Sequence, residues 1–241
     1  MARSYIIHLE TSTTRQPQVD ALCAALPNAQ VVDAVDGRLM SVADRDVVYR
    51  PKRYDPPYPF ALLPGEVGCF LSHRKCWELI ANSKDDYGLI FDDDVVLDAD
   101  LFSPAWALAK THMTPDRFIR LPLTDREAMA KTFGTSGQTA LFRPKQIALG
   151  TPAQMVGRNV ALRLIDLTAP FDRPVDTFLQ MNWLTGADVA TVYPNGLRSV
   201  AEEQGGSTIQ KKKNWAEKLP REWHRMRYRS KIRALAARHL G

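Results

Sequence analysis

The sequence contains few cysteines and no long hydrophobic run. Cys23, Cys69 and Cys76 are odd in number and show no C-x-x-C spacing, so neither a disulfide framework nor a zinc site is indicated. The first apolar run, over residues 5–9, is too short for the core of a signal peptide, and no later segment approaches a membrane span. We therefore expect a cytoplasmic protein, in which the cysteines are small buried side chains or spare thiols.

Most of the chain lacks a net positive charge, which is confined to one end. Residues 211–241 hold eleven Lys and Arg against Glu217 and Glu222, a net charge of +9; since the whole chain carries +5, residues 1–210 carry −4. The body is thus mildly acidic, and its aromatic residues form no stacking platform, which argues against nucleic acid as a partner. With 241 residues, 45% of them apolar, the chain can form one sizeable domain over 1–210 and a basic tail over 211–241.

Strand and helix patterns alternate along the domain, without internal repeats. Alternation of this kind predicts an α/β fold with a mainly parallel sheet flanked by helices. An irregular, proline-rich loop is expected over 47–64. The patterns predict strands over 5–9, 30–35, 87–91, 118–121, 139–142 and 189–193, and helices over 16–26, 66–82, 100–110, 153–167 and 174–183.

Three consecutive carboxylates, Asp92, Asp93 and Asp94, follow the apolar strand predicted over 87–91. Adjacent carboxylates repel one another, so such a tip is either solvated or neutralised by a cation. Hard oxygen ligands suit Mg²⁺ or Mn²⁺, and ligands of parallel sheets collect where strands end. Because side chains alternate along an extended chain, Asp92 and Asp94 share a face and are the predicted metal pair. An ordinary solvated turn is the alternative.

The segment from Leu63 to His73, followed by Trp77 and by Ile90 to Val95, resembles glycosyltransferase family 25. That family includes bacterial lipopolysaccharide and lipooligosaccharide glycosyltransferases and the related collagen galactosyltransferases. Asp92 stands where the family usually has Glu, and residues 150–154 depart from its usual Gly-Thr-x-Gly-Tyr. Smaller pieces of the likeness follow in the family's order at residues 6–9 with Arg15, and at 34–37, 150–153, 174–176 and 207–209.

The resemblance implies a GT-A-like fold over 1–210, with the basic helical tail beyond it. It also implies a UDP-sugar donor, Mn²⁺ or Mg²⁺ as cofactor, and inversion at the anomeric carbon. We expect a hexose, galactose more than glucose, to be moved to lipopolysaccharide, lipooligosaccharide or another cell-envelope glycan. The metal would neutralise the leaving diphosphate.

An inverting transfer needs a general base for the acceptor hydroxyl. Asp176 matches the family's acidic position, although it could equally be a helix cap. Glu66 is the second candidate, and as an acidic residue in a first helical turn it could simply stabilise the helix dipole.

Four further residues are predicted to contact the donor. Arg15 can pair with phosphate and Asp36 with ribose or base, unless Asp36 is only a turn residue. His73 can bind diphosphate or orient a carboxylate, with a hydrogen-bonded core histidine as the alternative. Asp93 would face away from Asp92 and Asp94 and accept hydrogen bonds from sugar or ribose hydroxyls, unless the turn reorients it or it is merely solvated.

Two other functions compete with the transferase. Haloacid-dehalogenase-type phosphatases also place Asp-x-Asp after an apolar strand, but Val95, Val96 and Leu97 lack the Thr that normally follows. A non-catalytic sugar-binding relative would keep the fold and lose turnover. The tail after Pro220 predicts a basic, weakly amphipathic helix that could bind anionic lipid at the inner face of the cytoplasmic membrane, or dock on the domain.

Overall fold

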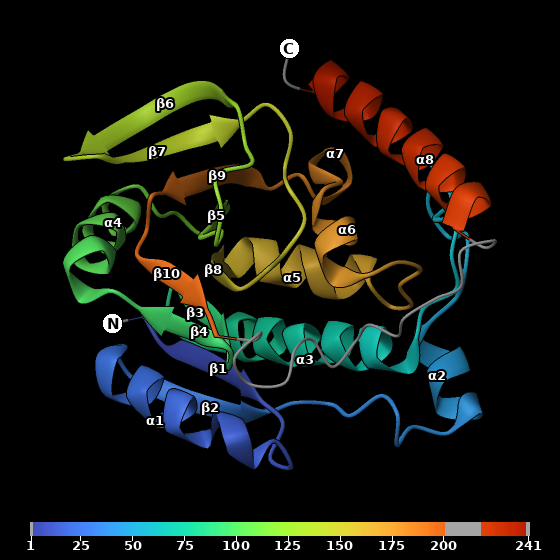
Figure 1. Ribbon diagram of the computed structural model, residues 1–241, viewed down its shortest axis with the longest axis horizontal. Helices are drawn as coiled ribbons and strands as arrows, with labels where there is room; N and C mark the ends of the chain where they lie inside the picture. Colours follow the sequence, from blue (N-terminus) through green and yellow to red (C-terminus); the bar gives the residue numbers. More distant parts are fainter. Residues whose placement is uncertain (1, 201–217, 240–241) are drawn as a thin grey trace.

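The computed structural model describes residues 2–200 and 218–239, with side chains from 221 in the second range (Figure 1). The described residues form an eight-stranded sheet in the order β2-β1-β3-β8-β5-β9-β7-β6. The strands are β1 (Ser4–His8), β2 (Ala29–Asp33), β3 (Tyr87–Asp92), β5 (Arg117–Arg120), β6 (Met129–Ser136), β7 (Thr139–Pro144), β8 (Ala153–Gly157) and β9 (Asp188–Tyr193).

Six of these strands run in one direction, and β7 and β8 run in the other. β1 pairs in parallel with β2 and β3, and β5 pairs in parallel with β9. β8 lies antiparallel between β3 and β5, and β7 lies antiparallel between β9 and β6. The expected mainly parallel, helix-flanked sheet is therefore confirmed, and the arrangement is consistent with a GT-A-like fold.

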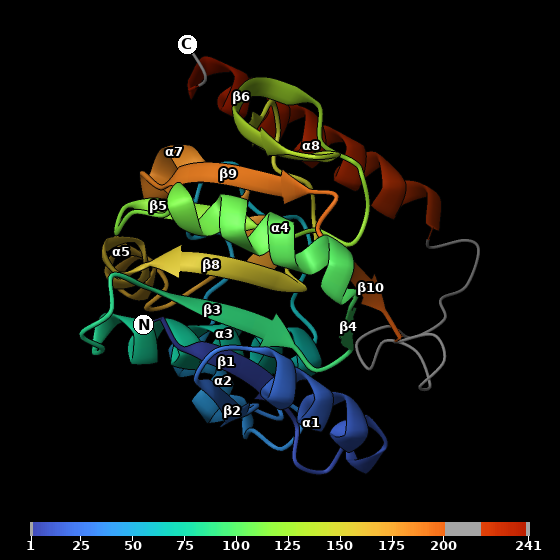
Figure 2. The same cartoon turned by 90° about the vertical axis from the view of Figure 1, so that its left-hand side faces the viewer.

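Helices cover both faces of the sheet (Figure 2). The helices are η1 (Thr13–Arg15), α1 (Gln16–Ala25), α2 (Val42–Val48), α3 (Pro64–Ala81), α4 (Ala99–Thr111), α5 (Arg158–Leu167), α6 (Val175–Leu179), α7 (Asn182–Thr185) and α8 (Lys218–His239). A second, two-stranded antiparallel sheet joins β4 (Val95–Leu97) to β10 (Leu197–Ser199).

Period-two alternation along the central strands divides the core in two. On β3, Leu89 and Phe91 pack with α1 and α4, whereas Ile90 packs with α3, α5 and α6. Ile6 and Tyr5 on β1 divide in the same way. Strands that bury both faces form the continuous apolar runs visible in the sequence.

Two predicted helices were partly wrong. Residues 153–157 of the helix expected over 153–167 form β8 instead, because this apolar stretch is fully buried between two strands and completes their hydrogen bonding. The helix expected over 174–183 is interrupted, so that α6 and α7 are separate short helices. β6 was not predicted, since most of its side chains are exposed and show little hydrophobic alternation.

Two glycines allow α3 to touch the segment that follows β2. A Cβ atom on Gly37 would lie 1.8 Å from the carbonyl oxygen of Pro64, and one on Gly68 would lie 2.3 Å from that of Val35. The Ser72 hydroxyl accepts a hydrogen bond from the Val35 amide at 2.8 Å. The glycine-containing motif at the start of α3 therefore positions the loop after β2, which carries Asp36.

Helix α8 begins close to the position expected from the sequence and packs against the domain. Tyr228, Ile232 and Ala236 are buried, whereas Trp223 and Met226 are exposed. Within the described ranges no helix is both long and apolar enough to cross a bilayer. The motif piece at 207–209 and the basic run at 211–213 lie outside the described residues. The division at residue 210 stays a prediction.

Candidate functional site

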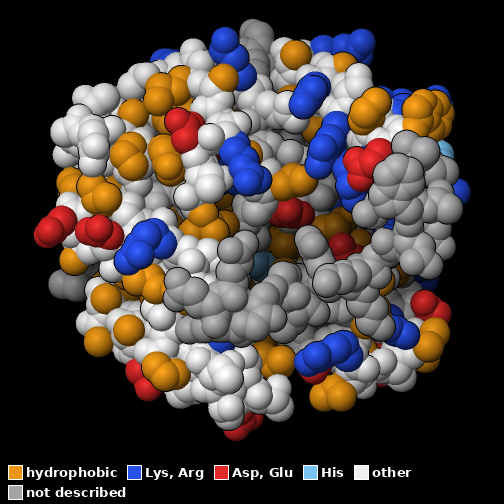
Figure 3. Space-filling model, in the orientation of Figure 1, with side chains coloured by type: hydrophobic (Ala, Val, Ile, Leu, Met, Phe, Trp, Pro, Cys, Tyr) orange, Lys and Arg blue, Asp and Glu red, His pale blue; other side chains and the backbone are white. Residues whose placement is uncertain are grey.

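A cleft of about 190 Å³ opens where β1, β2 and β3 end. We call it the acidic cleft, because Asp92, Asp93 and Asp94 all line it. Arg15 and Asp36, two of the residues predicted to contact the donor, line it as well. Figure 3 shows acidic atoms in a central hollow of this face of the molecule, with Lys and Arg side chains above it.

The acidic tip follows directly from the end of a buried strand. β3 ends at Asp92, and the next two residues form a turn that leads into β4. Burial, with the nearby carboxylates of Asp94 and Asp93, raises the pKa of Asp92 well above its usual value. Burial also raises the pKa of Asp94, although the Arg15 guanidinium opposes this effect. Crowded negative charge in a partly dehydrated cleft favours a bound cation.

The turn reorients Asp93, so the strict alternation expected along 92–94 is wrong at this point. Its side chain is buried, with one oxygen 2.7 Å from Nδ1 of His8 and the other accepting a hydrogen bond from Nη1 of Arg15 at 2.5 Å. The partners of the Asp93 carboxylate in the structure are thus the His8 ring and the Arg15 guanidinium. Contact with sugar or ribose hydroxyls stays a prediction.

Arg15 connects two of the three carboxylates. Besides its contact with Asp93, its Nη2 atom lies 4.0 Å from Oδ2 of Asp94. Asp36 lies across the acidic cleft and accepts hydrogen bonds from Nε and Nη2 of Arg38, at 2.8 and 2.6 Å. These bonds hold the pKa of Asp36 below its usual value. Arg38 is more than half exposed, so a second guanidinium is available at the rim.

His73 is completely buried beneath the acidic tip. Its Nδ1 atom lies 2.9 Å from Nε2 of Gln154, and its Nε2 atom lies 3.7 Å from Oδ1 of Asp92. Burial lowers the pKa of His73 to about 4, so the ring is neutral near pH 7. Of its two predicted roles, orienting a carboxylate fits this placement; the buried neutral ring is not presented to a diphosphate.

Glu66 and Asp176 lie near the acidic cleft without lining it. Both contribute, with Asp92 and Asp94, to raising the pKa of the buried Cys69 thiol, after the larger effect of burial. Glu66 accepts a hydrogen bond from the Leu63 amide at 2.7 Å, which closes the first turn of α3. The two predicted base candidates, Glu66 in α3 and Asp176 in α6, are therefore both close enough to affect a thiol that lines the acidic cleft.

Asp176 is held by two backbone amides. One oxygen accepts from the amide of Thr177 at 2.7 Å, and the other accepts from that of Gly150 at 3.1 Å. The second bond links α6 to the segment that departs from the usual family motif. Asp176 stands in the first turn of α6, so a capping contribution and a catalytic one are compatible.

The family model for glycosyltransferase family 25 (LPS biosynthesis protein) matches residues 1–179 of the chain. The chain belongs to glycosyltransferase family 25. The inactive glycosyltransferase 25 family member 3 of Mus musculus is 38% identical over 92 residues, which is 35% of this chain and 16% of the mouse protein. A glycosyltransferase 25 family member of Anopheles gambiae is 30% identical over 99 residues, 39% of this chain and 17% of the relative. Each match thus covers under a fifth of the relative's length.

The acidic cleft of this family 25 protein fits a divalent ion that is completed by its substrate. Among the described residues, no group of three or more His, Cys, Asp or Glu side chains surrounds a common point. Mg²⁺ is usually bound through one or two carboxylates together with substrate phosphates rather than by a full protein cage. Asp92 and Asp94 supply that number of hard oxygen ligands at one cleft.

Several residues of the site were missed by sequence reasoning. His8 holds Asp93, Arg38 holds Asp36, and Gln154 holds His73. Two signals marked His8: its position near the end of the first predicted strand, since parallel strands end at one edge, and its place in the family-like piece at residues 6–9. Nothing local marks Gln154, because its partner lies 81 positions away along the chain.

Proposed function

We propose that this family 25 protein is an inverting glycosyltransferase that moves a hexose, preferably galactose, from a UDP-sugar to a cell-envelope glycan such as lipopolysaccharide or lipooligosaccharide. The observation that supports this most is the acidic cleft, in which two cleft-facing carboxylates, Asp92 and Asp94, stand beside Arg15. Asp92 and Asp94 can bind a divalent ion, and the Arg15 guanidinium can contact the donor diphosphate that this ion would bind.

In the proposed mechanism, Asp92 and Asp94 hold Mn²⁺ or Mg²⁺, which when bound supplies positive charge to the leaving diphosphate. Arg15, fixed by Asp93, adds a further positive charge at the same place. Asp36 and Arg38 stand where the nucleoside would lie, next to the ends of β1 and β2. Gln154 orients the neutral His73 ring, whose Nε2 atom lies 3.7 Å from Oδ1 of Asp92 and limits the space on that side of the carboxylate.

The reaction joins an acceptor oxygen to the anomeric carbon and breaks the bond between that carbon and the diphosphate oxygen. The electron pair of the broken bond leaves with UDP, and the acceptor proton passes to a carboxylate acting as base. Asp176 is our choice, because it matches the family's acidic position and its backbone contacts hold it in a fixed orientation.

The Asp176→Asn variant is therefore expected to lower the transfer rate by at least about a hundredfold. Glu66→Gln keeps an oxygen that can accept from the Leu63 amide, so we expect less than about a tenfold loss from it. Single-turnover rates at saturating donor and acceptor separate the two. A larger loss for Glu66→Gln than for Asp176→Asn would reverse the assignment.

The proposed function is tested by incubating the protein with Mn²⁺ and a panel of UDP-sugars, with and without lipooligosaccharide acceptor. Acceptor-dependent UDP release is expected for one donor and to disappear when the ion is chelated. UDP release with every donor equal to that of a heat-inactivated sample would contradict the transferase. Release that persists in the chelator would contradict only the metal dependence.

A non-catalytic, sugar-binding protein is the second candidate. It is favoured by one observation, which is that the mouse relative carries the word inactive in its name. UDP binding without turnover in the same panel would support it. The family match over residues 1–179 argues against a phosphotransferase of another class.

Contact of α8 with an anionic membrane, at the inner face of the cytoplasmic membrane, remains part of the proposal. It is supported by the exposed Trp223 and Met226 among basic residues. Because Tyr228 and Ile232 belong to the core, deleting residues 211–241 would also damage the fold. Substitutions of Trp223 and Met226 test membrane binding without removing core residues of α8.

A further inference from the structure

A second cavity, of about 480 Å³, lies between α8 and the domain, and we call it the basic groove. It is lined by five basic side chains, and no Asp or Glu lines it among the residues that the structure describes. Three aromatic side chains, Tyr58, Phe60 and Tyr228, complete its wall. The basic side chains are Arg126, Lys145, Arg225, Arg229 and Arg233.

Most of this positive charge has no ion-pair partner among the residues that the structure describes. Arg225 forms an ion pair with Glu222, and Arg233 donates a hydrogen bond to the neutral Gln146 at 3.2 Å. In the described ranges, no carboxylate pairs with the other three basic side chains of the basic groove. Like charges that converge on a concave surface create a strong local potential, which an anionic ligand would neutralise.

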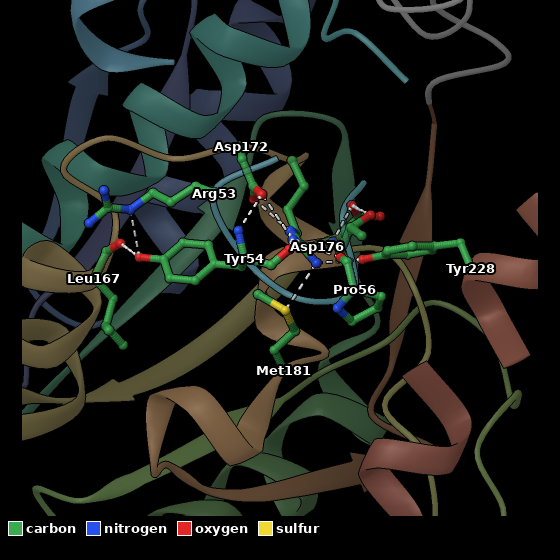
Figure 4. A network of polar contacts seen from close by, with 10 residues as sticks. Arg53, Tyr54, Pro56, Leu167, Asp172, Asp176, Met181 and Tyr228 are labelled. Atoms are coloured by element: carbon green, nitrogen blue, oxygen red, sulfur yellow. Dashed lines mark hydrogen bonds and ion pairs between the residues drawn. The ribbon is translucent and has the colours of Figure 1, made fainter. Parts of the chain in front are cut away.

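The aromatic wall is held in place by a buried network (Figure 4). The Tyr228 hydroxyl accepts a hydrogen bond from Nη1 of Arg173 at 2.8 Å, and Tyr58 packs edge-on against the Tyr228 ring. Arg173 is fully buried and is paired with Asp172 at 2.6 Å. Fixed aromatic rings beside guanidinium groups suit a ligand that has both apolar faces and anionic substituents.

The basic groove reaches the predicted general base. Thr177 of α6 and Gln180, directly after this helix, line it, and Asp176 is the neighbour of Thr177 in the chain. Leu149 lines it as well, next to Gly150, whose amide donates to Asp176. The Asp176 carboxylate is thus bonded to Thr177, which lines the basic groove, and to Gly150, which adjoins it, and its charge also acts on Cys69, which lines the acidic cleft.

We propose that the basic groove is the acceptor site and that the acceptor is a saccharide bearing phosphate or carboxylate groups. This rests on the proposed function, which assigns the donor diphosphate to the acidic cleft. The division of charge supports it, because the cavity that would bind a metal with the diphosphate is acidic, whereas the groove lined by Thr177, the neighbour of Asp176 in the chain, is basic. An anionic acceptor is attracted to the second cavity and repelled by the carboxylates of the first.

The test measures binding alone, by NMR chemical-shift titration of the full chain in low salt. The probes are glucose 6-phosphate, glucose and UDP with Mg²⁺. The groove variant combines Arg229→Gln with Arg233→Gln. The matched control combines Arg227→Gln with Arg238→Gln, two exposed arginines of the same helix that do not line the basic groove. Thermal unfolding checks that both variants fold.

Glucose 6-phosphate is expected to bind the wild type more tightly than glucose does. Its affinity should fall about tenfold in the groove variant and by less than about twofold in the control. UDP affinity should match the wild type in both. Because no turnover is required, a chain that binds glucose 6-phosphate in this way but transfers no sugar contradicts the proposed function and leaves the groove assigned to anionic saccharides.

Four results would overturn the proposal. The first is no binding of glucose 6-phosphate up to its solubility limit. The second is equal weakening in the groove variant and the control, since it indicates unspecific attraction. Weaker UDP binding in the groove variant is the third, because it would place the donor there. The fourth is loss of binding to phosphatidylglycerol vesicles in the groove variant with unchanged glucose 6-phosphate binding, which would assign the basic groove to lipid.

Discussion

An Asp94→Asn variant is expected to transfer sugar about a thousandfold more slowly than the wild type. Asparagine keeps the size of the side chain but removes one of the two charges of the proposed metal pair, Asp92 and Asp94. The leaving diphosphate would then lose most of its neutralisation, and each 1.4 kcal/mol lost corresponds to about a tenfold slower rate. The measurement is UDP release at saturating Mn²⁺, with the donor and acceptor that the panel identifies.

Asp100→Asn provides a matched control, because it makes the same change on an exposed residue at the start of α4. Its rate should stay within about twofold of the wild type. Both variants should also unfold at nearly the wild-type temperature, which separates chemistry from stability. A rate for Asp94→Asn within about tenfold of the wild type would remove this residue from the proposed metal pair.

An Arg173→Met variant is expected to lower the free energy of unfolding by about 3–5 kcal/mol. Arg173 has no exposed surface, and Asp172, its ion-pair partner, is 1% exposed. Removing the guanidinium leaves a buried carboxylate without its cation. It also removes the donors to the carbonyl oxygens of Tyr54 and Pro56 and to the Tyr228 hydroxyl. Urea unfolding monitored by circular dichroism measures the change.

Arg225→Met serves as the comparison for Arg173→Met. Arg225 pairs with Glu222 on α8, where the two side chains are 40% and 54% exposed, so the expected loss is about 0–1 kcal/mol. Adding Asp172→Asn to Arg173→Met removes both buried charges and should cost less than the sum of the single changes. Equal losses for Arg173→Met and Arg225→Met would show that the buried network does not hold α8 in place.

Local pattern was sufficient for most of the fold. The apolar runs at 5–9, 87–91 and 189–193 became central strands, because a strand buried on both faces requires continuous apolar residues. The helical stripe after Pro64 became α3 for a related reason, since its apolar side packs on the sheet. In these segments local preference and tertiary environment favour the same structure.

β8 shows where local pattern is ambiguous. Its five residues, 153–157, are buried on all sides and are followed without a break by α5. A short apolar run is compatible with a strand or with a buried helix, and the unpaired edges of β3 and β5 decide between them. That information lies about 30 to 65 positions away along the chain, so no local window contains it.

The alternating α/β plan, the acidic tip at 92–94 and the motif that begins α3 could be read from local sequence, because each depends on neighbouring residues. The surroundings of that tip depend on the tertiary structure. It turned Asp93 toward His8 and Arg15, placed His73 and Gln154 beneath Asp92, and brought α8 against the domain to form the basic groove. Those contacts join residues distant in the chain, and their geometry is set by how the strands and helices pack.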